Sequence, residues 1–387
     1  MSTKIAVPAD IRIGGGSLTG LLDVLARLEC RRPVVVTDAF LVGAGVADRV
    51  VALLAEAGHS VAVFDGVVPD PTTASVEAGW EVVGSHGADV LIGLGGGSPI
   101  DTAKALAVLA VRGGPLSALK APVSYDGPAL PVVAVPTTAG TGSEATRFTV
   151  ITDSDTGEKM LCTGAAYLPV AAVVDYTLTM SMPPRLTADT GIDALTHAVE
   201  AYVSRRHNAF SDALAIGAIG MIGQNLRQVF TDGADAEARS AMMTAATLAG
   251  IAFSNSSVAL VHGMSRPLGA RFHIAHGMAN AMLLARVTAF SVPAARDRYA
   301  DCARALGIAT AQDDDASASD ALVTELRRLA TDLGVPTPES SGITRQDWER
   351  AIPTMATQAL ASGSPAHNPR TPTQEQIEHL YHDLYTP

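Results

Sequence analysis

The sequence has little positive charge for its length. Its 387 residues include 27 lysines and arginines against 39 aspartates and glutamates, which gives a formal net charge of −12. Proteins that bind DNA or RNA present a basic surface to the phosphate backbone, and this composition provides none. We therefore expect no nucleic-acid partner.

Cysteine and long apolar runs are also scarce. Cys30, Cys162 and Cys302 lie far apart without paired spacing, which argues against a disulfide framework or a thiolate metal site and fits a reducing compartment. The N-terminus lacks the apolar stretch of a signal peptide, and no run approaches the roughly 18 apolar residues of a membrane helix. These absences predict a soluble cytoplasmic protein without a membrane partner. Aromatic residues make up only 4% of the chain, which fits a small substrate.

Two domains are expected from the length and from a change of pattern along the chain. The first half alternates short β-branched runs with helical patterns, as a parallel sheet covered by helices requires. After Pro183 and Pro184 the strand signals stop, and segments rich in Ala, Leu and Met follow. We predict a Rossmann-like α/β dinucleotide-binding domain at 1–180 and an all-α catalytic domain at 181–387. The expected strands are 33–38, 60–64, 89–94 and 131–135, and the expected helices of the first half are 46–57 and 100–111.

A glycine triplet joins one predicted strand to the next helix. Residues 95–101 read Gly-Gly-Gly-Ser-Pro-Ile-Asp. Three glycines let backbone N–H groups approach a pyrophosphate, and a helix N-terminus favours the same anion. The spacing differs from the usual G-x-G-x-x-G fingerprint, and a purely structural turn is the alternative.

Two further segments favour a dinucleotide. Residues 136–144 follow the next strand with many hydroxyls and glycines, which suits a loop along a nicotinamide ribose or amide. Asp38 stands at the carboxyl end of another strand, where a carboxylate binds the adenosine ribose diol and repels a 2′-phosphate. NAD is thus preferred over NADP, although Asp38 also suits a turn or a helix cap.

The second half contains a divalent-metal ligand set. Asp193 and His197 are four residues apart in a helical segment, so they share a face, and His262 and His276 each precede a glycine that permits close backbone approach. An isolated pair of this kind is more often a surface pair. Here the neighbours are small and apolar, so burial of Asp193 and His197 would cost several kcal/mol unless they have partners or bind a metal. The set suits Fe(II), Zn(II), Co(II) or Mn(II).

Together these motifs resemble the iron-containing (group III) alcohol dehydrogenase family. The resemblance rests on residues 95–101, 136–144, 191–202, 262–270, 276–281 and the Asn-Pro-Arg at 368–370. It implies a dehydroquinate synthase-like architecture with the active site in the cleft between the domains. It also implies that Asp193, His197, His262 and His276 are metal ligands, usually for Fe(II) and in some members for Zn(II), and that the chain forms a homodimer or larger homo-oligomer.

The resemblance also implies a set of cofactor contacts. Asp38 and Asp70 would bind the adenosine side of NAD(H). Gly96, Gly97 and Ser98 would bind the pyrophosphate. The nicotinamide half would lie along Thr137, Thr138, Thr141 and Ser143, with Lys159 and Leu178 as neighbours.

The chain departs from the family pattern at Arg266, where many members carry a histidine. A guanidinium near the metal can pair with a carboxylate, phosphonate or phosphate on a small aldehyde, or it can pair with a nearby acid of the protein. His273 is an additional imidazole, which either replaces the missing proton relay or packs against the ligands. We count Arg266 and His273 as candidate catalytic residues.

These inferences predict a metal-dependent NAD(H) alcohol dehydrogenase or aldehyde reductase. The metal would act as a Lewis acid on a small alcohol or aldehyde, including anionic ones such as a semialdehyde or phosphonoacetaldehyde. The alternative is a dehydroquinate synthase-like lyase that uses NAD and a metal without net oxidation.

Overall fold

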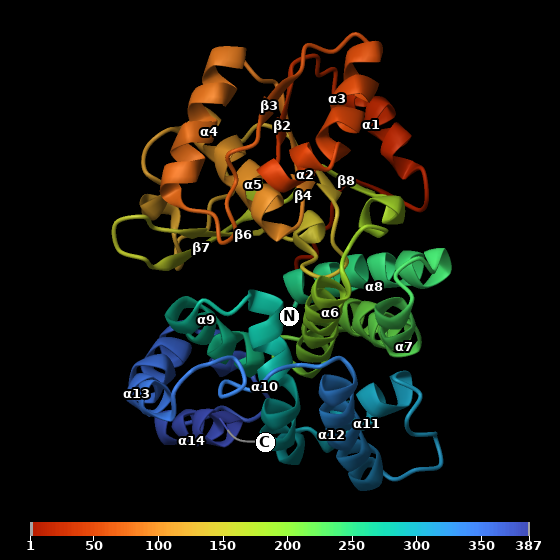
Figure 1. Ribbon diagram of the computed structural model, residues 1–387, viewed down its shortest axis with the longest axis vertical. Coiled ribbons are helices and arrows are strands. Elements are labelled where there is room, and N and C mark those ends of the chain that lie inside the picture. The colour runs from red at the N-terminus through yellow and green to blue at the C-terminus, as the bar shows by residue number, and fades with distance from the viewer. Residues whose placement is uncertain (1–2, 386–387) are drawn as a thin grey trace. The chain divides into compact units, whose positions relative to one another are not determined.

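The computed structural model describes residues 3–385 and shows two compact units (Figure 1). One unit is Lys4–Ser181, and the other begins at Met182. The assignment of residues 1–180 to dinucleotide binding and of 181–387 to metal binding stays a prediction.

A six-stranded parallel sheet forms the centre of the N-terminal unit. Its strand order is β1-β8-β5-β4-β2-β3, and every neighbouring pair is parallel. The strands are β1 (Asp10–Ile13), β2 (Pro33–Val36), β3 (Ala62–Phe64), β4 (Val90–Gly95), β5 (Val132–Pro136) and β8 (Ala171–Val174). This sheet confirms the predicted fold class. A separate antiparallel pair, β6 (Phe148–Thr152) and β7 (Lys159–Thr163), was not predicted.

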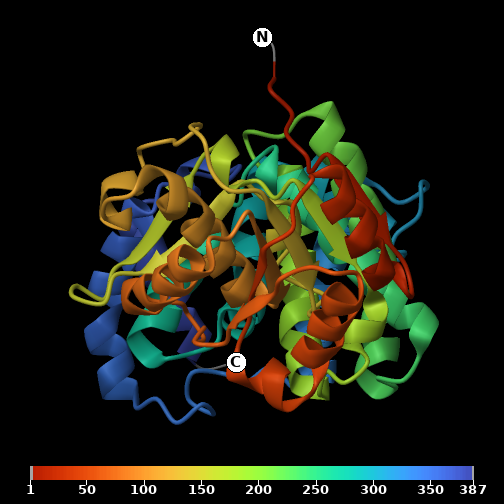
Figure 2. The same cartoon turned by 90° about the horizontal axis from the view of Figure 1, so that it is seen from above.

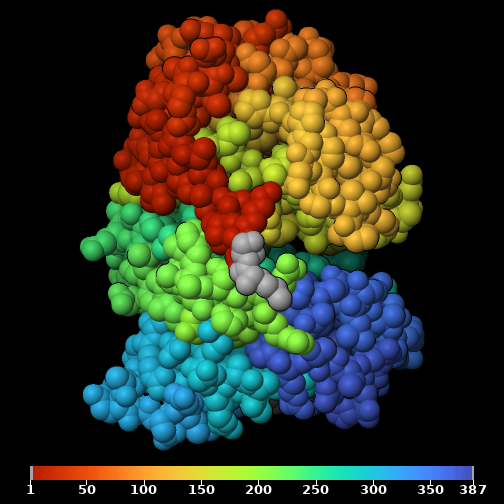
Figure 3. Space-filling view, turned by 180° about the vertical axis from the view of Figure 1, so that it is seen from behind, coloured from red at the N-terminus to blue at the C-terminus, as the bar shows by residue number. Residues whose placement is uncertain are grey.

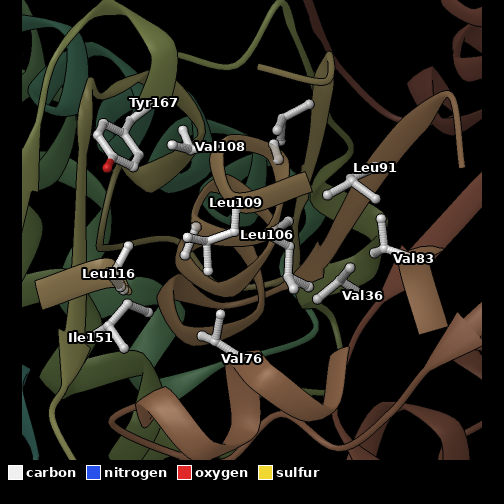
Figure 4. Packing of buried hydrophobic residues seen from close by; sticks show 14 of the residues in the cluster. Val36, Val76, Val83, Leu91, Leu106, Val108, Leu109, Leu116, Ile151 and Tyr167 are labelled. Atoms are coloured by element: carbon white, nitrogen blue, oxygen red, sulfur yellow. The ribbon is translucent and has the colours of Figure 1, made fainter. Parts of the chain in front are cut away.

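Helices cover both faces of this sheet. Val34 and Val36 of β2 pack in one apolar cluster, which Figure 4 shows, whereas Val35 packs in the other. Leu106 of α5 (Gly97–Arg112) belongs to the first cluster and Val50 of α3 (Val46–Glu56) to the second, so these two helices lie on opposite faces (Figure 2). In the space-filling view, the red N-terminal helices and the orange-yellow segments after them form separate flanks of this unit (Figure 3). The helices are α1 (Leu21–Arg27), α2 (Ala39–Gly43), α3 (Val46–Glu56), α4 (Thr73–His86) and α5 (Gly97–Arg112), and the short 3-10 turns are η1 (Ser17–Gly20), η2 (Leu116–Leu119), η3 (Ser143–Ala145), η4 (Ala165–Tyr167) and η5 (Tyr176–Thr179).

The strand order has a switch point between β2 and β4. From β2 the chain passes through α3 to β3, and it then returns through α4 to β4 on the other side of β2. Ligands of such sheets bind outside the carboxyl ends of the strands at the switch point. Asp38 follows β2, Gly96 follows β4 and Thr137 follows β5, so three predicted cofactor segments lie at this edge.

The C-terminal unit is helical throughout its described length, as predicted. Its first helix, α6, begins at Pro184, and almost every residue from Thr187 onward is buried. A helix buried on all sides requires neighbours all round, and α7, α8 and α10 pack against it. The helices are α6 (Pro184–Val203), α7 (Ala209–Thr231), α8 (Ala236–Ser254), α9 (Leu260–Phe272), α10 (His276–Ser291), α11 (Arg296–Ala305), α12 (Asp315–Asp332), α13 (Arg345–Ala361) and α14 (Gln374–Tyr385), with the turns η6 (Val292–Ala294) and η7 (Ser364–His367).

Among the described helices, none combines the length and the apolar character needed to cross a membrane.

Gly95, where β4 turns toward α5, should tolerate no side chain. Its φ is +149°, and an added Cβ would lie 2.4 Å from Cγ of Pro99. We expect Gly95→Ala to lower the free energy of unfolding by about 2–4 kcal/mol, because strain and a clash add. Gly84→Ala is the control: Gly84 lies within α4 with open space around its Cα, so alanine should stabilise by about 0.5–1 kcal/mol. Urea denaturation measures both, and an unchanged stability for Gly95→Ala would contradict the packing described here.

Candidate functional site

The glycine loop ends in a helix N-terminus that no side chain caps. Gly96 is the N-cap of α5, and Gly97 and Ser98 are its first residues. The first N–H groups of a helix have no acceptor within the helix, and they carry the positive end of its dipole. This geometry suits the pyrophosphate that the sequence analysis placed here.

The loop after β5 lies against the glycine loop. Thr137 donates its backbone N–H to the carbonyl oxygen of Gly95 at 2.9 Å. A Cβ on Gly96 would lie 3.3 Å from Oγ1 of Thr138, and one on Gly97 would lie 3.2 Å from Cγ2 of Thr141. Oγ1 of Thr138 is buried and has no hydrogen-bond partner among the described residues. It is therefore a polar group that a ligand can satisfy.

Ser143 belongs to a buried polar network. Its Oγ donates to Oδ1 of Asp101 at 2.5 Å and accepts from Nζ of Lys104 at 3.0 Å. Lys104 is fully buried, and its other two bonds go to Oγ1 of Thr146 at 3.0 Å and the carbonyl oxygen of Phe148 at 2.8 Å. Burial lowers the pKa of Lys104 to about 8, and the nearby Asp101 opposes this shift. The network fixes the predicted nicotinamide loop against α5.

Asp38 caps a helix. Its Oδ1 accepts from the backbone N–H of Leu41 at 2.9 Å and makes Asp38 the N-cap of α2. The capping alternative raised by the sequence is thus observed. It does not conflict with ribose binding, because a carboxylate has further acceptor sites, so the ribose role stays a prediction.

The remaining predicted cofactor residues have different surroundings. Nζ of Lys159 lies 2.8 Å from Oδ1 of Asp70, so the structure joins these two predicted residues in an ion pair. Asp70 adopts a positive φ of 52°. Leu178 is buried in the apolar cluster on the α3 face of the sheet. Contacts of all three with NAD(H) stay predictions.

Three acidic and imidazole side chains share one buried face of α6. Asp193, His197 and Glu200 are spaced four and three residues apart, which brings them onto the same side of a helix. All three are buried. Burial raises the pKa of the Asp193 carboxyl, and the attraction of His276 and a hydrogen bond from Asn280 counteract it.

Helices α9 and α10 bring two more imidazoles to this face. Ligand atoms of Asp193, His262 and His276 lie within 4.8 Å of one another. Nε2 of His197 lies 2.9 Å from Nε2 of His262, and its Nδ1 lies 4.0 Å from Oδ2 of Asp193. The structure therefore brings Asp193, His262 and His276 within reach of one cation, and it places His197, the fourth predicted ligand, against His262. A Cβ on Gly277 would lie 2.5 Å from the carbonyl oxygen of Asp189, which shows why a glycine follows His276.

The amide of Asn280 tests whether a cation fits this cluster. Its Nδ2 lies 2.6 Å from Oδ1 of Asp193 and 3.2 Å from Nε2 of both His262 and His276. An amide nitrogen has only two protons for these three acceptors. Oδ1 of Asn280 is itself buried without a partner among the described residues. The cluster thus has more lone pairs than protons, and a divalent cation with oxygen and imidazole ligands fits it.

Glu200 extends the cluster on the other side of His262. One oxygen, Oε2, lies 2.6 Å from Nδ1 of His262 and accepts from the N–H of Ala259 at 2.8 Å. The other, Oε1, accepts from the N–H of Val261 at 2.6 Å. Burial raises the pKa of Glu200 to about 7, and the two backbone donors oppose this shift.

Arg266 lies one turn after His262 on α9. Its Nη1 donates to Oγ of Ser364 at 3.1 Å, and among residues 3–385 no carboxylate forms an ion pair with it. Burial lowers the pKa of Arg266, whereas the charge of Glu200 raises it. The positive charge of Arg266 in turn helps to lower the pKa of His262, for which burial is the larger cause.

His273 ends α9 rather than joining the cluster. It is the C-cap residue with a left-handed φ of 55°, and its side chain is exposed. Among the described residues no hydrogen bond links it to a predicted ligand. A proton-relay role for His273 stays a prediction.

Comparison with known proteins assigns the family. Residues 8–176 match the family model "Iron-containing alcohol dehydrogenase", and residues 187–385 match "Fe-containing alcohol dehydrogenase family, C-terminal". The chain belongs to the iron-containing alcohol dehydrogenase family. It is therefore an oxidoreductase of the alcohol dehydrogenase class, and the predicted family resemblance is confirmed.

Individual members of the family match along the whole chain. Lactaldehyde reductase of Escherichia coli (strain K12) is 37% identical over 388 residues and is covered completely, as is this chain. A solved 1,3-propanediol oxidoreductase superposes with a TM-score of 0.96 at 34% identity, with full coverage of both chains. Sulfoacetaldehyde reductase from Bifidobacterium kashiwanohense, solved in complex with NAD+, has a TM-score of 0.89 at 28% identity and covers 100% of this chain and 99% of its own. These structures share the dehydroquinate synthase-like fold that was predicted.

Four residues with a place in these sites were not singled out from the sequence. Asn280 is four residues after His276 and Glu200 three after His197, so helical spacing from the predicted ligands was the available signal. Asp101 and Lys104 stand one turn apart at the start of α5, but their bonds to Ser143 are tertiary contacts that spacing does not reveal.

Asp38→Asn separates the capping role of Asp38 from its charge. Asparagine caps a helix about as well as aspartate, so stability should be unchanged. Loss of the negative charge should raise the ratio of kcat/KM with NADPH to that with NADH by about 10-fold, because repulsion of the 2′-phosphate is removed. An unchanged cofactor ratio, at unchanged stability, would show that Asp38 is only a cap.

Proposed function

We propose that this protein is a metal-dependent NAD(H) alcohol dehydrogenase or aldehyde reductase that acts on a small substrate with an anionic group. The observation that carries the proposal is the convergence of Asp193, His262 and His276 on the amide of Asn280, with His197 beside them. Asp193 and His262 are buried, and His276 closes the cluster from a more exposed position. Unsatisfied acceptors of buried groups are costly, and a bound cation would satisfy them. Two relatives named as aldehyde reductases, one of them solved with NAD+, support the activity.

Each group of residues has a role in this proposal. Asp193, His197, His262 and His276 would hold Fe(II) or Zn(II), which when bound supplies a Lewis acid for an alcohol or carbonyl oxygen. The uncapped N-terminus of α5 would bind the pyrophosphate of NAD(H), and the loop held by Lys104 would position the nicotinamide half. We also propose that the protein is cytoplasmic, which fits its few unpaired cysteines, and that it forms a homo-oligomer, as the family resemblance implies.

Arg266 supports the anionic substrate. It stands on the helix of His262, it is partly buried, and no ion pair neutralises it among the described residues. A buried cation without a counter-ion is costly, and an anion bound beside it recovers part of that cost. One solved relative is named for sulfoacetaldehyde, an aldehyde that carries a sulfonate. We infer that a carboxylate, phosphonate or similar group of the substrate binds Arg266.

Removal of the metal should abolish turnover. We expect protein dialysed against a chelator to lose NADH oxidation with an aldehyde, and added Fe(II) or Zn(II) to restore it, because the ligands are imidazole and carboxylate. Mg(II), which prefers oxygen ligands, should not restore it. Absorbance of NADH follows the reaction. Full activity of metal-free protein would contradict the proposal, and substrate conversion without net NADH oxidation would favour the lyase alternative.

Replacement of Arg266 by alanine should act selectively on anionic aldehydes. With succinic semialdehyde, kcat/KM should fall about 10- to 100-fold, which corresponds to the loss of a hydrogen-bonded charge pair. With butanal, a neutral aldehyde of the same chain length, it should change little.

Arg271→Ala provides the matched control, because Arg271 is exposed in the last turn of the same helix. It should leave both aldehydes unaffected. An equal loss of activity on succinic semialdehyde and butanal in Arg266→Ala would show that Arg266 maintains the site without touching the anionic group.

A further inference from the structure

The buried carboxylate of Glu200 makes three short contacts. Two are with the backbone N–H groups of Ala259 and Val261, and the third is with Nδ1 of His262. Ala259 is the N-cap of α9 and has no side chain that can cap it. Glu200 therefore reaches from α6 to hold the first turn of α9, and this bond pattern fixes the direction in which its oxygens face.

The contact with Glu200 determines which ring nitrogen of His262 carries the proton. Both oxygens of Glu200 accept from backbone N–H groups, which stabilises the ionised form. An ionised carboxylate can only accept hydrogen bonds, so the contact of 2.6 Å to Nδ1 places the proton of His262 on Nδ1. The other nitrogen, Nε2, is then deprotonated. It faces Nε2 of His197 at 2.9 Å and Oδ1 of Asp193 at 3.7 Å, which is the side of the metal ligands.

We propose that Glu200 is a positioning residue that holds His262 in the tautomer able to bind the metal. This inference rests on the proposed metal-dependent function. Glu200 acts through His262: it orients the ring, keeps the proton on Nδ1 and leaves the lone pair of Nε2 for the cation. Carboxylates that hydrogen-bond a metal-bound histidine in this way also make the ring a stronger ligand.

The geometry of α6 explains why one helix supplies both kinds of group. Asp193 and Glu200 are seven residues apart, so they lie two turns apart on the same face. His262 lies between them, with Nε2 toward Asp193 and Nδ1 toward Glu200. A single imidazole thus connects a ligand carboxylate to a positioning carboxylate of the same helix.

Glu200→Gln tests this role because it keeps the size of the side chain but removes the negative charge that holds the proton on Nδ1 of His262. Oε2 faces both the N–H of Ala259 and Nδ1 of His262. The amide therefore either turns its NH2 toward them, which moves the proton of His262 to Nε2, or keeps its oxygen there as an uncharged, weaker acceptor with its NH2 against the N–H of Val261. Metal-free protein is titrated with Zn(II) in competition with a chromophoric chelator. We expect Glu200→Gln to weaken Zn(II) binding about 10- to 100-fold.

Two further variants complete the experiment. Glu325 of α12 is a partly buried carboxylate of the same unit that pairs with Arg227 of α7, away from the predicted ligands, and Glu325→Gln should bind Zn(II) like the unchanged protein. Glu200→Asp keeps an acceptor-only carboxylate on a shorter chain, so its affinity should lie between those of the unchanged protein and Glu200→Gln. Circular dichroism of the metal-free variants and their urea midpoints report folding separately from binding.

The possible results separate this inference from the function on which it rests. Zn(II) binding by Glu200→Gln as tight as that of the unchanged protein would overturn the positioning role. The positioning role would also be overturned if Glu200→Asp and Glu200→Gln lost Zn(II) affinity equally and in proportion to their loss of stability. That result would show that Glu200 only caps the first turn of α9. If Glu200→Gln does not fold, Glu200→Asp decides: folded protein with unweakened Zn(II) binding overturns the role, and weakened binding at an unchanged urea midpoint supports it. Failure of the unchanged protein and Glu325→Gln to bind Zn(II) would instead overturn the proposed metal dependence.

Discussion

The burial of acidic side chains on α6 is the constraint on which the helical unit depends. Asp193 and Glu200 are removed from water inside a helix that is covered on all sides. A buried carboxylate is tolerated only when other groups compensate its charge or satisfy its oxygens. The start of α9 does this for Glu200, and Asn280 on α10 does it for Asp193. Helices α9 and α10 must therefore pack against α6 in the positions that bring these partners to the two carboxylates.

In the N-terminal unit, by contrast, the buried charged groups are satisfied by one another and by neighbouring protein groups. Lys104 directs its ammonium group to three acceptors of the protein, and Asp101 receives Ser143 and the backbone N–H of Val150. These groups satisfy one another, so they shape a loop and leave no demand for a ligand. The open polar groups beside the glycine loop are different: they include the backbone donors at the start of α5 and the hydroxyl of Thr138. The buried Lys104 and Asp101 of the N-terminal unit therefore have protein partners, whereas the cluster around Asn280 in the C-terminal unit has more acceptors than donors.

Features that appear as a spacing of residues within one strand or helix could be predicted from the sequence. The parallel sheet followed from the β-branched runs, and Asp193 and His197 from their separation by one helical turn. Sequence reasoning could not distinguish a helix cap from a ribose ligand at Asp38, because both need a carboxylate after a strand. Nor could it find the bonds of Glu200 to the first turn of α9, since that partnership arises only when distant helices pack. The hairpin of β6 and β7 was not predicted, because its strands are short and follow directly after residues 136–144, which were interpreted as a cofactor loop.

The origin of the ligands in three helices has a consequence for how the protein is made. The side chains that meet at Asn280 come from α6, α9 and α10, so a chain leaving the ribosome has no complete site until His276 and Asn280 have been synthesised. By then α6, with Asp193 and Glu200, has already been synthesised without the partners that α9 and α10 supply. A cation that binds only the assembled helices would draw the folding equilibrium toward them. Under the proposed metal dependence, the supply of metal in the cell would govern the yield of folded protein as well as its activity.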